Sequence, residues 1–280
     1  MSRLLIVDGS NLLFQMFFGM PSRIVNKDGR AIQGTLGFVG ALQRMIRHLK
    51  PTHVAVLFDG EHDNDRRLID PEYKSNRPDY SDLDENDNPF SQLPDIYSSL
   101  DLLGIRHAET SVCESDDWIA GYALTYGEQC EVIISSFDSD FFQLITDSVS
   151  VFRYRGDKSQ LCTPSYIRER LGILPSQYAD FKSLVGDSAD NIKGVSKIGP
   201  KTAAELLGTY GSLDGIIENV QSISKPSVKT SLLQNIERLS VNYSLIKLNN
   251  STPLPFTVDC LEYVDKGLST NEILRSIGLI

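Results

Sequence analysis

The sequence predicts an α/β fold in which a mostly parallel, twisted sheet is flanked by helices and followed by a helical second region. Three short apolar runs rich in β-branched residues indicate buried strands: LLIVD (4–8), HVAVLFD (53–59) and EVIISSFDSD (131–140). Helix-like stretches lie between them, GTLGFVGALQRMIRHL (34–49) and DDWIAGYALTYG (116–127). Alternating strands and helices are typical of a doubly wound sheet, whose ligands bind beyond the carboxyl ends of the strands.

The composition limits both the class of protein and the kind of metal site. With 280 residues and 41% hydrophobic content, the chain can bury one large domain, or one domain and an appendage. The four cysteines have no CxxC spacing and the four histidines form no HExxH pair, so any metal site must be rich in oxygen ligands. No apolar run reaches the ~20 residues of a membrane span, and the one at the start is too short for a signal peptide, so we expect a cytoplasmic protein.

Aspartates end all three predicted strands and would meet at one edge of the sheet: Asp8, Asp59, Asp138 and Asp140. A single strand-terminal aspartate is commonly a turn residue, but three strands that end in this way argue against that explanation. The net charge of −10 normally excludes a nucleic-acid partner, because phosphate binding requires a basic face. Cations bound to a carboxylate cluster would remove this objection.

A second acidic group precedes the helix predicted at 116–127. Ser115 can cap this helix, and Asp116 and Asp117 suit the positive end of its dipole. Capping therefore explains two acids and leaves Glu114 unexplained.

The segment 73–96 is polar and contains three prolines, which indicates a long exposed insertion or lid, partly disordered. Lys74 and Arg77 lie at its beginning, and acidic residues crowd its middle. A solvated loop and a functional element remain open as explanations.

From residue 160 onward, short helices with proline in the first turn and glycine near the end are predicted: PSYIRERLG, PSQYADFKSLVG and PKTAAELLGTYG. We expect an α/β domain at 1–160, a helical region at 161–250 and an extension at 251–280. In this extension PFTVDCLEYV is strand-like and STNEILRSIG is a short helix.

The hairpin GVSKIG (194–199) leads directly into a helix. Gly194 and Gly199 allow the backbone to approach a phosphate, and Lys197 and Lys201 flank it. A glycine-rich hairpin without a ligand is the alternative. It does not explain the two acids before the hairpin, Asp187 and Asp190, which a helical spacing of i and i+3 would place on one face.

Nine acids that converge on one edge require counter-ions. Oxygen ligands suit Mg²⁺ or Mn²⁺, and two such ions ~4 Å apart stabilise an in-line phosphodiester displacement. The acids are Asp8, Asp59, Glu114, Asp116, Asp117, Asp138, Asp140, Asp187 and Asp190.

These motifs, in order and spacing, resemble those of the 5′-3′ exonuclease and flap endonuclease family, which includes the 5′ nuclease domain of bacterial DNA polymerase I and stand-alone enzymes. The similarity spans roughly residues 3–250 and is carried by DGSNLLF, LFDG, PEYKSNRP, ESDDWIA, SSFDSDFFQL and GDSADNIKGVSKIGPKTAAELL. It implies a PIN/5′ nuclease-like fold, a helical arch at 73–96, and a helix-hairpin-helix at 187–207. It also implies that the nine acids surround two Mg²⁺ or Mn²⁺ ions.

The resemblance also implies roles for residues outside the acids. Lys74 and Arg77 would lie at the base of the arch, where Lys74 would stabilise charge on the scissile phosphate. Backbone carbonyls in the helix-hairpin-helix would hold K⁺: those of Leu184, Val185, Lys193, Val195 and Ile198. DNA contacts would come from Tyr73, Gly194, Lys197, Gly199, Lys201 and Thr202.

Some residues depart from the family pattern. Phe137 and Ser139 stand where Gly and Lys are usual, Lys193 replaces a Pro, and Gly60 follows Asp59 where Ala is frequent. We therefore weigh a structure-specific 5′ nuclease acting on DNA with a flap, overhang or nick against a branched-DNA-binding relative with weak or lost chemistry. A phosphatase with Asp8 as nucleophile leaves the hairpin unexplained. No polymerase-sized extension follows, so we expect a monomer that acts alone or beside a separate polymerase.

Overall fold

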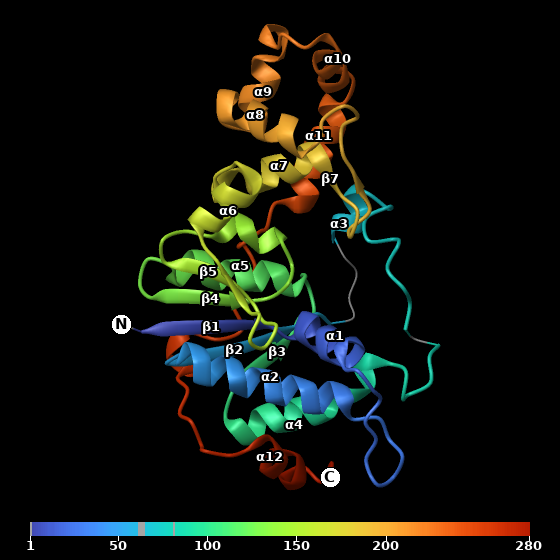
Figure 1. Cartoon of the computed structure of the whole chain (residues 1–280), viewed down its shortest axis with the longest axis vertical. Helices are drawn as coiled ribbons and strands as arrows, with labels where there is room; N and C mark the ends of the chain where they lie inside the picture. Colours follow the sequence, from blue (N-terminus) through green and yellow to red (C-terminus); the bar gives the residue numbers. More distant parts are fainter. Residues whose placement is uncertain (1, 61–64, 81) are drawn as a thin grey trace.

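The computed structural model describes residues 2–60, 65–80 and 82–280. Its centre is a six-stranded sheet with the order β3-β2-β1-β4-β5-β6 (Figure 1). The first five strands are parallel and β6 is antiparallel to β5. The strands are β1 (Arg3–Asp8), β2 (His53–Phe58), β3 (Arg106–Glu109), β4 (Glu131–Ser135), β5 (Val149–Arg153) and β6 (Gln160–Cys162). The predicted mostly parallel sheet is confirmed.

Strand β1 lies at the centre of the sheet, between β2 and β4. This position explains why its residues 4–7 are all apolar. Its residues 4–7 are fully buried, because helices cover both faces of the sheet. Asp8 is paired with Leu57 in β2, and Val7 with Ser135 in β4, so three strands end at the same edge. The strand order reverses between β1 and β4, which is where ligands bind in open α/β sheets.

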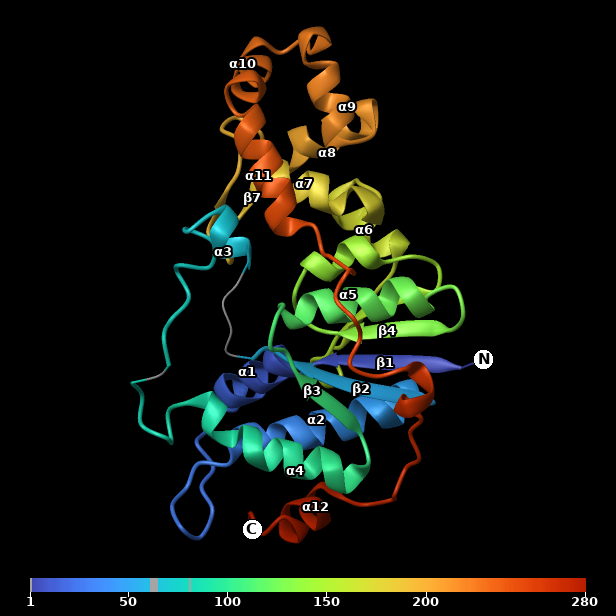
Figure 2. The same ribbon diagram turned by 180° about the vertical axis from the view of Figure 1, so that it is seen from behind.

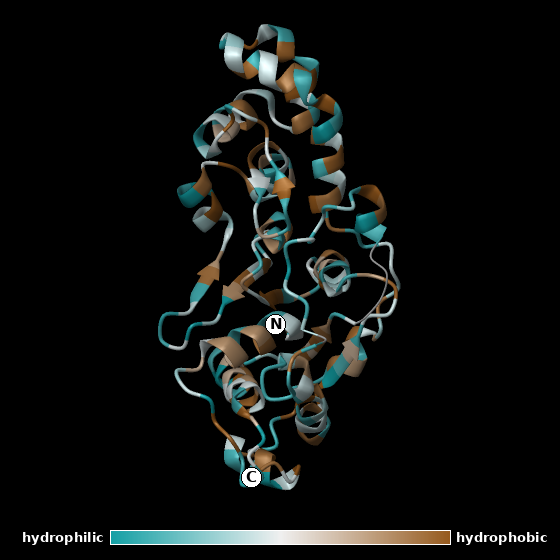
Figure 3. Ribbon diagram, turned by 90° about the vertical axis from the view of Figure 1, so that its right-hand side faces the viewer, coloured by the Kyte–Doolittle hydropathy of each residue, from teal (hydrophilic) through white to brown (hydrophobic). Residues whose placement is uncertain are grey.

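Helices α1 (Gly9–Gly19), α2 (Gln33–Leu49) and α4 (Leu93–Leu103) cover one face, and α5 (Ser115–Tyr126) covers the other. Leu5 and Val7 pack with Phe38 on the first face, whereas Leu4 and Ile6 pack with Tyr122 on the second. In Figure 3 the strands are largely brown, whereas the surrounding helices combine brown and teal residues. None of the helices in the described ranges is long and apolar enough to cross a membrane.

The helical region stands at one end of the molecule (Figures 1 and 2). It contains α6 (Pro164–Leu171), α7 (Tyr178–Val185), α8 (Pro200–Tyr210), α9 (Leu213–Glu218), α10 (Pro226–Gln234) and α11 (Ile236–Ile246). A two-stranded hairpin, β7 (Gly186–Asp187) with β8 (Ile192–Lys193), connects α7 to the turn before α8. Helices α6 and α8 begin with proline as predicted, and α6 ends at Gly172 in the left-handed conformation.

The segment predicted as a helical arch is mostly not helical. Short α3 (Asp65–Ile69) precedes it, and its helical part is the 3₁₀ helix η1 (Pro89–Gln92) with the first turn of α4. The described residues between 70 and 88 form turns and irregular stretches, as expected where Pro71 and Pro78 interrupt helical hydrogen bonding. Residue 81, also part of this prediction, lies outside the described residues. The described chain runs along the side of the molecule, from α3 beside α11 to η1 (Figures 1 and 2).

Two further expectations are wrong. The stretch PFTVDCLEYV is not a strand: it forms the 3₁₀ helix η5 (Val258–Leu261) and an isolated bridge between Glu262 and His53. Asp187 and Asp190 do not share a helical face, because a β-hairpin occupies these positions. The predicted C-terminal helix is confirmed as α12 (Thr270–Ser276), which begins with a capping box formed by Ser269 and Glu272.

Candidate active site

The acids that end β1, β2 and β4 meet at the carboxyl edge of the sheet. Asp8 caps α1 by accepting from the Asn11 amide (3.0 Å), and it also accepts from the Ser136 hydroxyl (2.7 Å). Asp59 accepts from the Ser115 amide (2.8 Å), which ties the end of β2 to the start of α5. The turn after β4 is held by Asp138, which accepts from the Asp140 amide (2.8 Å).

Burial and close approach perturb the pKa values of these carboxyls and their neighbours. Burial, followed by repulsion from Asp59 and Asp138, raises the pKa of Asp8 to about 7. Burial and the neighbouring Asp138 raise the pKa of Asp116 and that of Asp140 well above the usual range of a carboxyl group. The site therefore holds more negative charge than its surroundings can stabilise.

The donor set fits a hydrated divalent cation. Oδ1 of Asp140 is buried without a hydrogen-bond partner, and the Asp116 side chain makes no hydrogen bond or ion pair within the described part of the chain. Among the described residues, no three or more His, Cys, Asp or Glu side chains form a ready-made metal cage. Mg²⁺ does not need such a cage, since it keeps several waters and takes few carboxylates. Which acids ligate metal stays a prediction.

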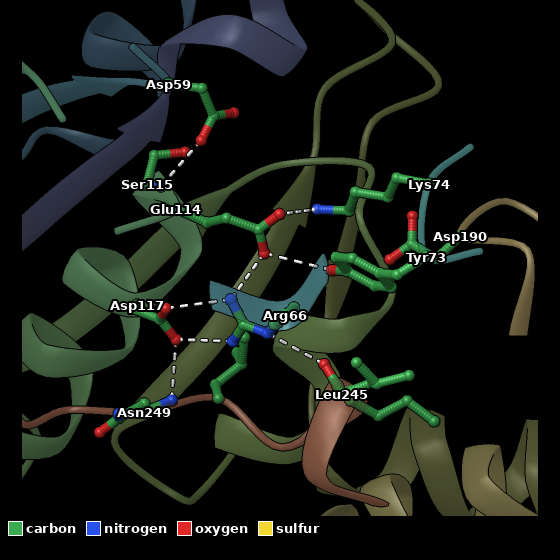
Figure 4. Close-up of polar contacts among 12 residues, drawn as sticks. Asp59, Arg66, Tyr73, Lys74, Glu114, Ser115, Asp117, Asp190, Leu245 and Asn249 are labelled. Carbon is green, nitrogen blue, oxygen red and sulfur yellow. Dashed lines mark hydrogen bonds and ion pairs between the residues drawn. The ribbon is translucent and has the colours of Figure 1, made fainter. Parts of the chain in front are cut away.

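Two predicted metal ligands are paired with a residue that the sequence did not single out (Figure 4). Arg66, on α3, donates from Nη1 to Glu114 (2.6 Å) and to Asp117 (3.0 Å), and from Nη2 to the other oxygen of Asp117 (2.8 Å). Burial alone would lower the pKa of Arg66, but these two carboxylates raise it. In the sequence nothing distinguishes Arg66 from its exposed neighbour Arg67, since only the tertiary contacts differ.

Lys74 and Tyr73 lie against the same acid. Lys74 is buried and forms an ion pair with Glu114, and the Tyr73 hydroxyl donates to Glu114 at 3.2 Å. Burial would lower the pKa of Lys74, but Glu114, Asp116 and Asp190 together raise it. The Lys74 side chain is therefore a fixed ammonium beside the acids.

The base of the insertion is joined to the β7–β8 hairpin. Arg77 donates to the Asp190 carboxylate (2.9 Å), and the Lys74 amide donates to the Asp190 carbonyl (3.0 Å). Asp187 forms an ion pair with Lys182 on α7. Asp190 and Asp187 both contribute to the raised pKa values of Asp138 and Asp140, so the charge of the hairpin acids acts on the acids that follow β4.

The helix-hairpin-helix consists of α7, the hairpin and α8, so it begins before residue 187. Three of the carbonyls predicted for K⁺ accept hydrogen bonds: Leu184 from the Val195 amide (2.8 Å), Val195 from the Ile198 amide (3.2 Å) and Lys193 from Asn242 (2.9 Å). Each carbonyl retains a second lone pair. The K⁺ site, which also includes Val185 and Ile198, stays a prediction.

The glycines of this hairpin have different structural roles. A Cβ on Gly194 would lie 2.2 Å from the Val185 carbonyl oxygen, whereas a Cβ on Gly199 would meet nothing within 4 Å. Gly194 is thus required for packing, a role that the DNA-binding prediction did not include. Lys197 and Lys201 are exposed beside Gly199, and Thr202 is half-buried in the first turn of α8. Their contact with DNA stays a prediction.

Comparisons with known proteins agree with this geometry. Residues 3–172 match the family model of the 5′-3′ exonuclease N-terminal resolvase-like domain, and residues 173–267 match that of the 5′-3′ exonuclease C-terminal SAM fold. DNA polymerase I of Streptococcus pneumoniae strain R6 is 32% identical over 268 residues, which are 93% of this chain and 30% of the relative. The chain thus spans about a third of the length of the curated relatives it matches.

Solved structures share the fold. The bacteriophage T5 flap endonuclease, in a pseudo-enzyme–product complex with DNA and metal ions, superposes with a TM-score of 0.73 at 24% identity, covering 98% of this chain and 97% of that one. The catalytic core of Rad2 in complex with DNA substrate gives a TM-score of 0.57 at 14% identity, covering 99% and 93%. At these identities the similarity establishes the architecture of both regions.

Proposed function

Because the chain belongs to the 5′-3′ exonuclease family, we propose that it is a divalent-metal-dependent, structure-specific 5′ nuclease that hydrolyses DNA phosphodiester bonds near junctions of single strand and duplex. One observation carries the proposal. Asp8, Asp116, Asp138 and Asp140 are crowded at one edge of the sheet with raised pKa values, beside the buried ammonium of Lys74.

At the sheet edge and the start of α5, we propose that metal is held by the carboxylates for which no ion pair with a cationic side chain occurs among the described residues: Asp8, Asp59, Asp116, Asp138 and Asp140. On the opposite side, Asp187 and Asp190, which are paired with Lys182 and Arg77, would complete the site. Mg²⁺ or Mn²⁺ bound there would act as a Lewis acid on the phosphate and lower the pKa of a bound water. Lys74, held by Glu114, supplies a fixed positive charge toward a phosphate at this edge.

The DNA-binding surface we propose has two parts. The hairpin before α8 presents Lys197, Lys201 and Thr202 with the amides of the helix N-terminus, a suitable contact for the duplex backbone, and K⁺ on the nearby carbonyls would add positive charge. Tyr73 and Arg77 lie at the base of the insertion, next to the acids, where the single strand would pass. The same proposal includes three further points. The substrate is DNA with a flap, an overhang or a nick, the enzyme is a monomer, and its partner is a separate polymerase.

The test is cleavage of a 5′-flap duplex labelled at both ends, in Mg²⁺, Mn²⁺ or chelator. Wild type should cut near the junction in either metal and not in chelator. Asp116→Asn, which keeps the size of the side chain and removes its charge, should lower the rate at least about 100-fold while DNA affinity in chelator stays within twofold.

The exposed Asp147→Asn is the matched control and should cut as wild type does. Binding of the flap without cutting in any metal would instead support the branched-DNA-binding alternative. Phe137, whose ring lies under the Arg155 guanidinium at 5.1 Å, would then be the residue to replace by Gly.

A further inference from the structure

We propose that Arg66 is a positioning residue that orients the start of α5, and with it Asp116 and Lys74, for the reaction. This inference rests on the proposed function. It concerns a basic side chain that lies between Glu114, Asp117 and the Leu245 carbonyl (Figure 4).

The Arg66 guanidinium binds the Asp117 carboxylate through two parallel hydrogen bonds, a bidentate pair that we call the fork. The residue is 8% exposed, and its Nη1 and Nη2 contact the two oxygens of Asp117 at 3.0 and 2.8 Å. Nη1 also donates to Glu114 at 2.6 Å. A planar guanidinium holds a carboxylate in one orientation, whereas a lysine ammonium at the same place would not.

The two acids held by Arg66 stand on either side of Asp116 in the sequence. The Asp117 amide also donates to the Glu114 carbonyl at 3.1 Å, so the backbone around Asp116 is fixed by its neighbours. Among the described residues no hydrogen bond or ion pair holds the Asp116 side chain, so its direction depends on this backbone. Glu114 in turn holds the Lys74 ammonium, so the same fork sets the position of that charge.

Arg66 also connects three parts of the chain. Its Nε donates to the Leu245 carbonyl (3.0 Å) at the end of α11, where a helix leaves carbonyls without intrahelical partners. Oδ1 of Asp117 accepts from the Asn249 amide (2.8 Å) just beyond that helix. The base of the insertion, the start of α5 and the helical region therefore meet at one guanidinium.

Docking of the insertion base does not depend on Arg66 alone. Asp70 forms an ion pair with Arg238 on α11 (2.5 Å), and Asn191 donates to the Glu72 carbonyl (2.9 Å). These separate contacts are expected to keep the segment in place when the fork is replaced. What is lost is the orientation of Glu114 and Asp117.

The experiment compares Arg66→Lys with Arg67→Lys, an exposed position on the same short helix. Both substitutions keep the net charge, so a difference between them reports geometry. We measure kcat and KM on the 5′-flap duplex in Mg²⁺, and Mn²⁺ affinity of the DNA-free protein by electron paramagnetic resonance. Thermal unfolding verifies that each variant is folded.

For Arg66→Lys we expect kcat and Mn²⁺ affinity to fall about 10- to 100-fold, as when partners that orient metal ligands are removed, with KM within about twofold. Arg67→Lys should match wild type. Asp117→Asn removes the negative charge and one of the two oxygens that accept from Arg66, and it should give a similar loss. The double variant should lose less than the product of the two single losses.

If Arg66→Lys has the same kcat and the same Mn²⁺ affinity as Arg67→Lys, the inference is overturned. If Arg66→Lys does not fold, Asp117→Asn decides: wild-type values overturn the inference, and reduced kcat with weakened Mn²⁺ binding supports it. A wild type that cuts no DNA would refute the proposed function, and the Mn²⁺ affinities of the DNA-free variants would still test the role of Arg66.

Discussion

At the scale of single residues, the site is made of carboxylates in two environments. Glu114 and Asp117 are paired with Arg66 and Lys74, whereas Asp8, Asp116 and Asp140 have raised pKa values because burial and mutual repulsion penalise their charged forms. The sequence predicts that the acids crowd at one edge, but it does not show which of them are paired with a cationic side chain. The difference predicts which of them depend on a cation.

Asp8 provides a test by pH. Its folded pKa of about 7 exceeds the usual 3.8, so between these values the folded state holds a proton that the unfolded state releases. This contribution to stability is complete below about pH 4 and is lost as the pH rises through 7. In chelator, Asp8→Asn should therefore raise the Tm at pH 8 by about 5 °C and change it little at pH 4.

Asparagine is a suitable replacement because it can still accept from the Asn11 amide and cap α1. Asp147→Asn, at an exposed position, should leave the Tm unchanged at both pH values. An Asp8→Asn variant less stable than wild type at pH 8 would contradict the raised pKa.

At the scale of elements, the hairpin between α7 and α8 shows how closely backbone segments approach. Gly186, at φ +84°, and Gly194 let the hairpin lie directly on the end of α7. The sequence predicted glycines for phosphate contact, but the structure gives Gly194 a packing role that holds without any ligand. The prediction of a capped helix starting at Pro200 was correct, since proline in the first turn is a local signal.

Replacement of these glycines separates packing from DNA contact. Gly194→Ala forces Cβ against the Val185 carbonyl oxygen and should lower the free energy of unfolding by about 1–3 kcal/mol. Gly199→Ala, with open space around its Cβ and φ of −91°, should change it by less than about 0.5 kcal/mol. Urea unfolding of both variants measures the difference, and equal stabilities would show that the close approach is not required.

At the scale of the whole molecule, the site lies where distant segments of the chain meet. The sheet edge supplies Asp8, Asp59 and Asp138, and α5 supplies Asp116. The base of the insertion supplies Lys74, and the hairpin of the helical region supplies Asp190 (Figure 4). An ion bound among these acids would stabilise the folded state as a whole.

Addition of Mg²⁺ should consequently raise the Tm. At a free concentration of ~100 times the dissociation constant, binding at one site adds about 2.7 kcal/mol to the free energy of unfolding. The increase should be larger at pH 8 than at pH 5, because protons compete for the carboxylates with raised pKa values. Differential scanning calorimetry against NaCl of equal ionic strength measures this, and equal Tm values in the two salts would refute a metal site.

The sequence by itself determined the class of fold, the parallel strands and the set of acids at their ends, because apolar periodicity and strand-end residues are local signals. The helical arch expected at 73–96 came from the family resemblance, whereas the composition of that segment indicated an exposed insertion. The sequence did not predict β3, β5 and β6 or helices α1 and α4. Those segments depend on their neighbours: β3, for example, has no fully buried residue and is defined by its pairing with β2.

Only the tertiary structure decided which acids are paired with a cationic side chain and which instead have raised pKa values. Arg66 and Arg67 are adjacent and identical in type, yet one is buried between Glu114 and Asp117 and the other is exposed. The physical reason is that the charge state and direction of a side chain are set by contacts across the fold. Arg66 contacts Glu114 and Asp117, which lie 48 and 51 positions further along the chain, and no local sequence pattern predicts contacts over such separations.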